Sequence, residues 1–349
     1  MSGPAMCDGS VMPPSDHLDV FAGLPVIRWN DPATSLDPAK VAWRLDDWNE
    51  ECTDYGDMEE ALDAIVARTG PEGPVAVVVG LWSDPSDTPF DVEWFVGNAH
   101  RFGRLRALFI GDMTQSDDHI ESFHITLTDV TPLLEAVPTL EVFGVHGLGE
   151  ELELGPVRHE KLRTLIVQTD DLRPETARTL GASDLPALID LELHLSTWYA
   201  DEGVTPGDLD AILAGRSFPA LRRLGLRAAG DTDSFAAALA SAPVVAQLTD
   251  LDLSLGTLGD EGVEALLAGQ PLTHLRSLSV RHHYVTPGAV QRLVDGLPGV
   301  HVDASGRQDA QGGERRSTHD EAPEDRELRQ EWRRERAATR ARLLDEARA

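Results

Sequence analysis

The chain has little cysteine and no long apolar segment. Its 349 residues contain two cysteines, Cys7 and Cys52, and these lack the spacing of a metal site. So few thiols favour a reducing compartment. No run of 18 apolar residues is present to span a membrane, and the first residues lack the basic start and apolar core of a secretory signal. We therefore expect a cytoplasmic protein.

Positive charge is also scarce. The chain has 30 Lys and Arg against 60 Asp and Glu, a formal net charge of −30, and its only lysines are Lys40 and Lys161. Residues 304–349 hold 11 Arg and 11 acidic residues, which cancel, so the excess lies in the preceding residues. Such a field disfavours nucleic acid and anionic membranes and suits a basic protein partner. Alternatively, the charge only keeps the protein soluble.

Catalytic motifs are missing as well. The sequence contains no HExxH, CxxC, Gly-rich phosphate loop or GxSxG. We therefore expect no enzymatic activity, no cofactor and no metal.

A short phrase recurs instead: Leu, two residues, an apolar residue, one residue, and a second apolar residue. Its seven copies begin at Leu105, Leu140, Leu162, Leu188, Leu221, Leu248 and Leu275, with spacings of 35, 22, 26, 33, 27 and 27 residues. The last two apolar positions are two residues apart, so both point to one face of a short strand. A period in the twenties with this pattern is typical of leucine-rich repeats.

Helix signals lie between the phrases. Thr131, Thr205 and Thr286 each precede a proline and then spaced apolar residues, which is typical of a capped helix start. Strand and helix in alternation predict an α/β leucine-rich-repeat solenoid, a horseshoe with a parallel inner sheet and outer helices.

One unit also carries a family resemblance. The stretches Leu-Asp-Leu-Ser from Leu251 and Leu-Gly-Asp-Glu-Gly from Leu258 resemble the ribonuclease-inhibitor-like class of leucine-rich repeats. The arrangement from about residue 18 to 303 is also similar to a family of uncharacterised leucine-rich-repeat proteins of actinobacteria. The class usually has Asn or Cys three residues after the last strand Leu, whereas this chain has Met113, Leu148, Asp170, Ser196, Ala229, Gly256 and His283. The resemblance implies binding and no activity.

The composition divides the chain into five parts. We expect a disordered N-terminus at 1–17, an N-terminal cap at 18–73 that includes Trp29 and Trp43, and the repeat array at 74–303. A flexible linker at 304–322 and a charged amphipathic helix at 323–349 follow.

The concave inner face and the loops at the strand exits are the expected binding surface. The candidate residues are Phe109, Val142, His146, Ile166, Asp190, Glu192, His194, Trp198, Tyr199, Arg223, Arg227, Asp252 and Arg281. Loops could instead cover the apolar residues among them, and Trp198 and Tyr199 could pack on a neighbouring repeat. His146 and His194 lie two strands apart, roughly 10 Å, which is too far to share one metal without a third element.

The C-terminal helix offers a second candidate surface. An arginine stripe beside Trp332 could dock on an acidic body, with Arg329, Trp332, Arg333 and Arg336 as the contact residues. The alternative is a solvated helix, and the sequence leaves open whether its own solenoid or a partner would receive it.

The sequence thus predicts a non-catalytic protein–protein interaction scaffold of unknown oligomeric state. The alternative is an accessory subunit or minor enzyme that binds a metal or small ligand near His146, His194 and Arg227. Nucleic-acid binding by the arginine stripe conflicts with the charge of the body.

Overall fold

The computed structural model describes residues 17–31, 36–45, 58–80, 82, 89–112, 126–196, 203–310, 314–317, 339 and 341–348. Its strands are β1 (Val20–Phe21), β2 (Leu24–Arg28), β3 (Ala42–Leu45), β4 (Ala76–Val79), β5 (Ala107–Ile110), β6 (Val142–Gly147), β7 (Thr164–Thr169), β8 (Asp190–His194), β9 (Arg223–Arg227), β10 (Asp250–Asp252), β11 (Ser277–Ser279) and β12 (His301–Asp303). Its helices are α1 (Met58–Thr69), α2 (Val92–Gly97), α3 (Thr131–Ala136), α4 (Pro174–Gly181), α5 (Asp210–Leu213), α6 (Thr232–Leu239), α7 (Asp260–Ala268) and α8 (Pro287–Gly296), with 3-10 turns η1 (Ala99–Arg101), η3 (Pro206–Leu209) and η4 (Pro243–Gln247).

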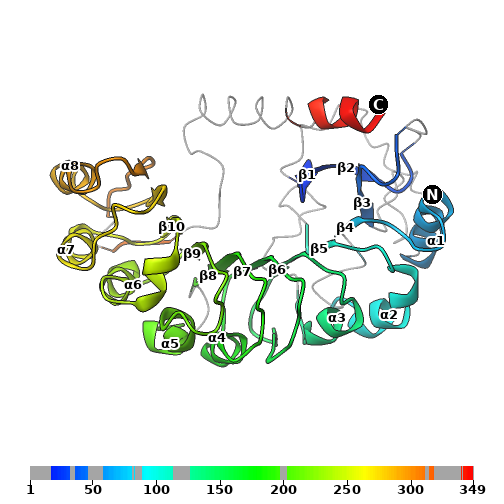
Figure 1. The fold of residues 1–349 in the computed structure, drawn as a ribbon, viewed down its shortest axis with the longest axis horizontal. Helices are drawn as coiled ribbons and strands as arrows, with labels where there is room; N and C mark the ends of the chain where they lie inside the picture. Colours follow the sequence, from blue (N-terminus) through cyan, green and yellow to red (C-terminus); the bar gives the residue numbers. More distant parts are fainter. Residues whose placement is uncertain are drawn as a thin grey trace, which may run out of the picture.

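The strands of the described residues form one sheet in the order of the sequence, from β1 to β12. Strands β2 to β12 are parallel, and β1 pairs antiparallel with β2 at the edge. In Figure 1 the strands run along the inner side of a curved array, and α2 to α8 lie along its outer side. Sequence-adjacent strands that stay neighbours, each joined by an outer helix or turn, give the solenoid-like arrangement that the repeats predict.

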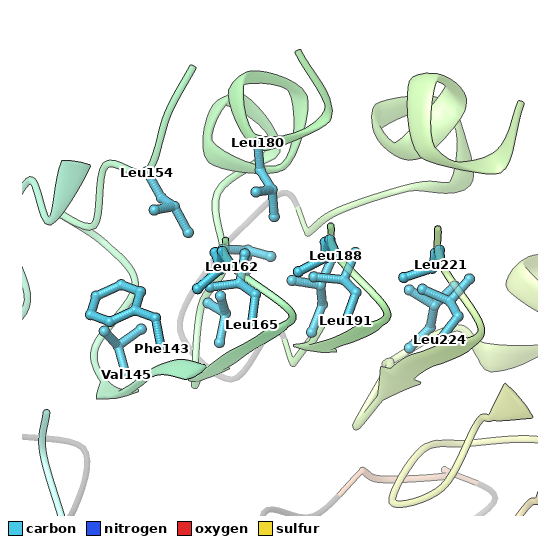
Figure 2. Close-up of a cluster of buried hydrophobic side chains, with 14 of the residues drawn as sticks. Phe143, Val145, Leu154, Leu162, Leu165, Leu180, Leu188, Leu191, Leu221 and Leu224 are labelled. Atoms are coloured by element: carbon cyan, nitrogen blue, oxygen red, sulfur yellow. The ribbon is translucent and has the colours of Figure 1, made fainter. Parts of the chain in front are cut away.

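The repeat phrase builds the core. Leu162, Leu165 and Val167 are fully buried, as are the matching residues of the neighbouring repeats. Figure 2 shows Leu162 and Leu165 stacked on the matching leucines of the next repeats, Leu188 with Leu191 and Leu221 with Leu224, and Leu180 of α4 directed toward them from the outer layer. Full burial of one such side chain stabilises the fold by about 1.5–3 kcal/mol. A single repeat has no second layer for these residues, so the core exists only in the stack.

The N-terminal region continues the sheet of the array. Strand β3 pairs in parallel with both β2 and β4, so residues expected in a cap extend the sheet. Helix α1 lies between β3 and β4 in the chain, and its Ala61, Leu62 and Ile65 join the same core as Trp43. The apolar segments before residue 74 are therefore irregular repeat units, which their lack of the full phrase concealed.

Thr and His side chains hold the turns after several strands. Thr232 and Thr257 bridge two repeats: the Thr257 N–H donates to Thr232 Oγ1 at 2.8 Å, and the Thr232 N–H donates to Thr257 Oγ1 at 3.2 Å. The buried His283 accepts a bond from the Val285 N–H at Nδ1 (3.0 Å) and faces the Ala304 carbonyl with Nε2 (2.9 Å). These side chains pair backbone groups that burial would otherwise leave unsatisfied.

The described residues after β12 contact the array. The Gln308 N–H donates to the His283 carbonyl at 2.7 Å, and the Arg315 guanidinium donates to Asp233 at 2.7 Å. Residues expected in a flexible linker are therefore held against the last repeats at these points. Further on, residues 341–348 form a helix at the opposite end of the array, where the N-terminal strands lie (Figure 1).

The C-terminal helix docks on this chain's own N-terminal region. Ala347 is 1% exposed and belongs to the main core, and Leu344 packs against that core. The Asp37 N–H donates to the Ala347 carbonyl at 2.8 Å, and Lys40 Nζ donates to the Glu346 carbonyl at 3.2 Å. Among the described residues, no helix is both long and apolar enough to cross a membrane.

Candidate interaction surface

The inner face, the side of the sheet turned away from the helices, carries aligned rows of side chains. One row runs through Ala107, Val142, Thr164, Asp190, Arg223, Asp250 and Ser277, and the next through Phe109, Gly144, Ile166, Glu192, Gly225, Asp252 and Ser279. This is the alignment that period-two strands in parallel register require. The candidate residues of the inner face therefore stand beside one another, although up to 35 residues separate consecutive phrases.

The apolar part of the inner face is covered by the chain itself. Phe109 is 5% exposed because Phe21 of β1 packs on it edge to face, with ring centroids 5.9 Å apart. Gly144 makes room for this ring, since a Cβ there would lie 2.4 Å from Phe109. Val142 and Ile166 stay half-buried at the border of the same cluster. Phe109 is thus a core residue here rather than an open contact, and a terminal segment covers it.

A buried ion pair holds this covering segment in place. Arg44 of β3 donates to the Asp112 carboxylate and, at 2.6 Å, to the Asp112 carbonyl. The Leu18 N–H donates to Asp112 Oδ1 at 3.1 Å, and His17 Nδ1 lies 3.0 Å from the Asp112 carbonyl. Burial alone would raise the pKa of the Asp112 carboxyl, but Arg44, His17 and the Leu18 N–H together hold it well below its usual range. Asp112 therefore stays charged and fixes the start of the described chain beside β5.

Ion pairs continue along the first row of the inner face. Arg223 Nη2 lies 2.7 Å from Asp190 Oδ2, and Arg276 contacts both carboxylate oxygens of Asp250 at 2.9 Å. Burial raises the pKa of Asp190, against the opposing effect of Arg223. Ser277 donates to Asp250, whose pKa is lowered because these hydrogen bonds and Arg276 outweigh its burial. Each carboxylate of this row thus has an arginine partner.

A denser cluster centres on Glu192 in the second row. Its Oε1 lies 2.9 Å from Arg227 Nη1, 3.2 Å from His194 Nε2 and 3.1 Å from Gln168 Nε2. Arg227 also reaches Asp252, with Nε 3.5 Å from Oδ2. Burial by itself would raise the pKa of Glu192, yet the hydrogen bond from His194 and the charge of Arg227 lower it to about 2. The cluster is a polar surface in which Arg227 bridges the carboxylates of Glu192 and Asp252.

The histidines of the inner face have separate partners. His146 of β6 has its Nδ1 3.0 Å from the Gly111 carbonyl, whereas His194 of β8 contacts Glu192 on the same strand. Among the described residues, no three His, Cys, Asp or Glu side chains come together in a way that could hold a metal. Arg281 lies half-buried just beyond β11.

Several candidate residues lie outside the part of the chain that the structure describes. They are Trp198, Tyr199, Arg329, Trp332, Arg333 and Arg336. Sequence reasoning missed Phe21, Arg44 and Asp112. The one available signal was Arg44, a charged residue within an otherwise apolar strand segment. Such a segment is expected to be buried, and a buried charge requires a partner.

One comparison with known structures agrees with the fold. No family model and no curated protein matches the chain. A crystal structure of a Bacteroides fragilis protein from a structural genomics programme is similar, with a TM-score of 0.65 and 24% identity over 77% of this chain and 76% of that chain. A crystal structure of a TLR13–ssRNA13 complex has a TM-score of 0.37 and 14% identity, over 82% of this chain and 38% of that one. The first likeness supports the repeat-like α/β fold, and the resemblance to actinobacterial repeat proteins stays a prediction.

Proposed function

We propose that this chain is a leucine-rich-repeat protein of the ribonuclease-inhibitor-like class, shaped as a horseshoe, that binds another protein through its inner face. The ion-paired half of that face, from Asp190 to Ser279, supports the proposal. Its side chains are aligned, and each of its carboxylates has an arginine partner, so a binding protein would meet no isolated carboxylate there. The scarcity of cysteine favours the cytoplasm as the place of action.

The half of the face with paired charges is the better candidate for the contact. The side chain of Arg223 is 45% exposed and that of Asp252 is 35% exposed, while the apolar half lies under Phe21. Arginine is enriched at energetically important interface positions because its planar donors bind carboxylates and stack on aromatic rings. We expect Arg223, Asp252 and the Glu192 cluster to supply the specific contacts.

Affinity capture from the native host with three forms of the full-length protein tests the proposal. The forms are the wild type, the double variant Arg223→Ala/Asp252→Ala, and the variant Arg292→Ala, which alters an exposed ion pair with Glu264 on the outer helices. We expect a stoichiometric protein captured by the wild type and by Arg292→Ala, and lost from the double variant. A partner retained equally by all three would refute binding at the inner face.

Metal analysis of untagged protein distinguishes the alternative, a metal-binding accessory subunit, from the protein-binding scaffold. A stoichiometric metal that disappears in His194→Ala would favour an accessory metal-binding subunit over the scaffold.

A further inference from the structure

We propose that a pocket at the strand-entry edge of β4 to β7 binds a compact group with two negative charges, such as a phosphomonoester or a dicarboxylate. The pocket has a volume of about 380 Å³, and its lining includes Val75, Arg104, Arg106, Thr139, Glu141 and Lys161. All of these residues lie just before the strands begin, whereas the proposed protein contact uses the strand faces and their exits. The pocket is therefore a second site.

The charge of the pocket opposes that of the rest of the protein. Three cations and one carboxylate line it, which leaves two positive charges in a chain with a formal net charge of −30. Glu141 is engaged with Arg106, whose Nη1 lies 2.8 Å from Oε1. Outside the lining, Glu72 approaches Arg104 Nε at 3.8 Å, but both side chains are exposed and such a pair is weak. A divalent anion matches the remaining charge.

Lys161, one of the two lysines of the chain, is held toward this edge by a buried histidine. His159 Nδ1 accepts bonds from the Lys161 N–H at 3.3 Å and the Leu162 N–H at 3.0 Å, while Nε2 faces the Val137 carbonyl at 3.3 Å. These contacts fix the turn that carries Lys161. Among the described residues, no carboxylate lies within ion-pair distance of the Lys161 ammonium group, which leaves its charge for a ligand.

The Arg104 side chain is positioned by backbone carbonyls of the preceding repeat, and the Arg106 side chain by Glu141. Arg104 Nη2 donates to the Thr69 carbonyl at 2.7 Å and to the Gly73 carbonyl at 3.0 Å, which orients its guanidinium. The main-chain N–H of Arg106 donates to the Val75 carbonyl at 2.8 Å, and the Arg106 carbonyl accepts a bond from the Glu141 N–H at 2.7 Å. The cations therefore come from stacked repeats in a fixed register. Preorganised donors bind an anion with less ordering of side chains on binding.

The volume of the pocket and the negative charge of the surrounding protein both favour a small ligand. The volume lies at the lower end of the range for small-molecule pockets. A polyanion such as nucleic acid, or an anionic membrane, would bring many charges against the acidic body and be repelled. A compact dianion places its charge only where the cations are, and charge-assisted bonds from Arg and Lys are the strong ones.

Titration calorimetry on the full-length protein tests the site, with inorganic phosphate and succinate as probes and chloride at matched ionic strength as the blank. Lys161→Ala removes a lining cation, and we expect it to weaken binding about tenfold, a loss typical of one charge-assisted contact. Glu141→Gln removes the lining carboxylate and should tighten binding. Arg216→Ala is the matched control because Arg216 is an exposed cation that does not line the pocket.

The opposite signs of the two pocket variants make the test decisive. One-to-one binding that weakens in Lys161→Ala, tightens in Glu141→Gln and is unchanged in Arg216→Ala would support the site. Binding of phosphate alone would favour a phosphate group as the ligand, and binding of succinate alone would favour a dicarboxylate. Equal weakening by Lys161→Ala and Arg216→Ala, or no heat with either probe, would overturn the proposal.

Discussion

Removal of Arg44 should destabilise the protein far more than removal of an arginine from an exposed pair. Arg44 and Asp112 are 5% and 6% exposed, so Arg44→Met leaves a buried carboxylate without its cation. Losing one partner of a buried pair costs about 3–5 kcal/mol. Asp112 keeps the Leu18 N–H and His17 nearby, so we expect about 3 kcal/mol, the lower end of that range.

Arg292→Met is the matched control, because Arg292 and Glu264 form an ion pair whose side chains are 54% and 55% exposed. Exposed pairs contribute about 0–1 kcal/mol. Denaturant unfolding followed by both fluorescence and circular dichroism measures the two free energies and tests two-state behaviour. Equal losses in both variants, or a loss below about 1 kcal/mol for Arg44→Met, would refute the reasoning.

The pH dependence supplies an independent check on the same pair. The pKa of Asp112 is lowered in the folded protein, so its contribution to stability is present above the pKa of the unfolded chain, about 3.9, and is lost below it. Without Arg44, burial raises the pKa of Asp112, because protonation then removes an unpaired charge. The difference between wild type and Arg44→Met should therefore shrink as the pH falls toward 4. A difference independent of pH would mean that lost packing, and not charge, explains the effect.

Four further measurements test other parts of the structure. Burial and the neighbouring Asp171 raise the pKa of Asp170 to about 6, so its ionisation opposes folding at pH 7. Asp170→Asn should raise the unfolding free energy there by at most about 3 kcal/mol, at 1.36 kcal/mol per pKa unit, and a gain that persists at pH 4 would contradict this cause. Burial lowers the pKa of His159 and His283 in the folded protein. On acidification the same histidines are protonated at a higher pH in the unfolded chain than in the folded one, so the free energy of unfolding should fall as the pH drops below about 6.5. The fall should be smaller in His283→Gln, and an equal slope would exclude His283 as a cause. The buried Thr169 hydroxyl has no hydrogen-bond partner among the described residues, so Thr169→Val should stabilise the fold by about 1 kcal/mol in denaturant unfolding, and a loss would show that the hydroxyl is satisfied. Ala347→Glu places a charge in the core and should raise hydrogen exchange across residues 341–348, whereas unchanged exchange would mean that the helix is held elsewhere.

The inner face was predictable from sequence where the repeat phrase is intact. Leu188, Leu221 and Leu248 each start a phrase, so the residues two positions on, Asp190, Arg223 and Asp250, had to align in one row. The phrase is a local pattern. Parallel pairing in register aligns equivalent positions of neighbouring repeats, so the rows can be predicted whatever the lengths of the loops. The pairing of Asp190 with Arg223 follows directly, because the two residues face each other across neighbouring strands.

Contacts between the repeats and distant segments of the chain were not predictable in this way. Phe109 occupies an inner-face position by its spacing, yet it is buried because residues before the array fold back over it. The partners Arg44 and Asp112 are 68 residues apart, and Arg44 lies in a strand without the repeat phrase. The C-terminal helix was recognisable as a helix, but its docking at residues 36–40 depends on the path of the chain between them.

The sequence by itself therefore determined the repeating strand and outer element, the buried leucines and the rows of the inner face, because these follow from periodicity within each unit. Only the tertiary structure decided which part of the inner face stays open and where the two end segments lie. It also decided that cations from separate repeats surround one pocket. These outcomes depend on contacts between residues distant in the chain, and no local pattern encodes which distant surface a segment will cover.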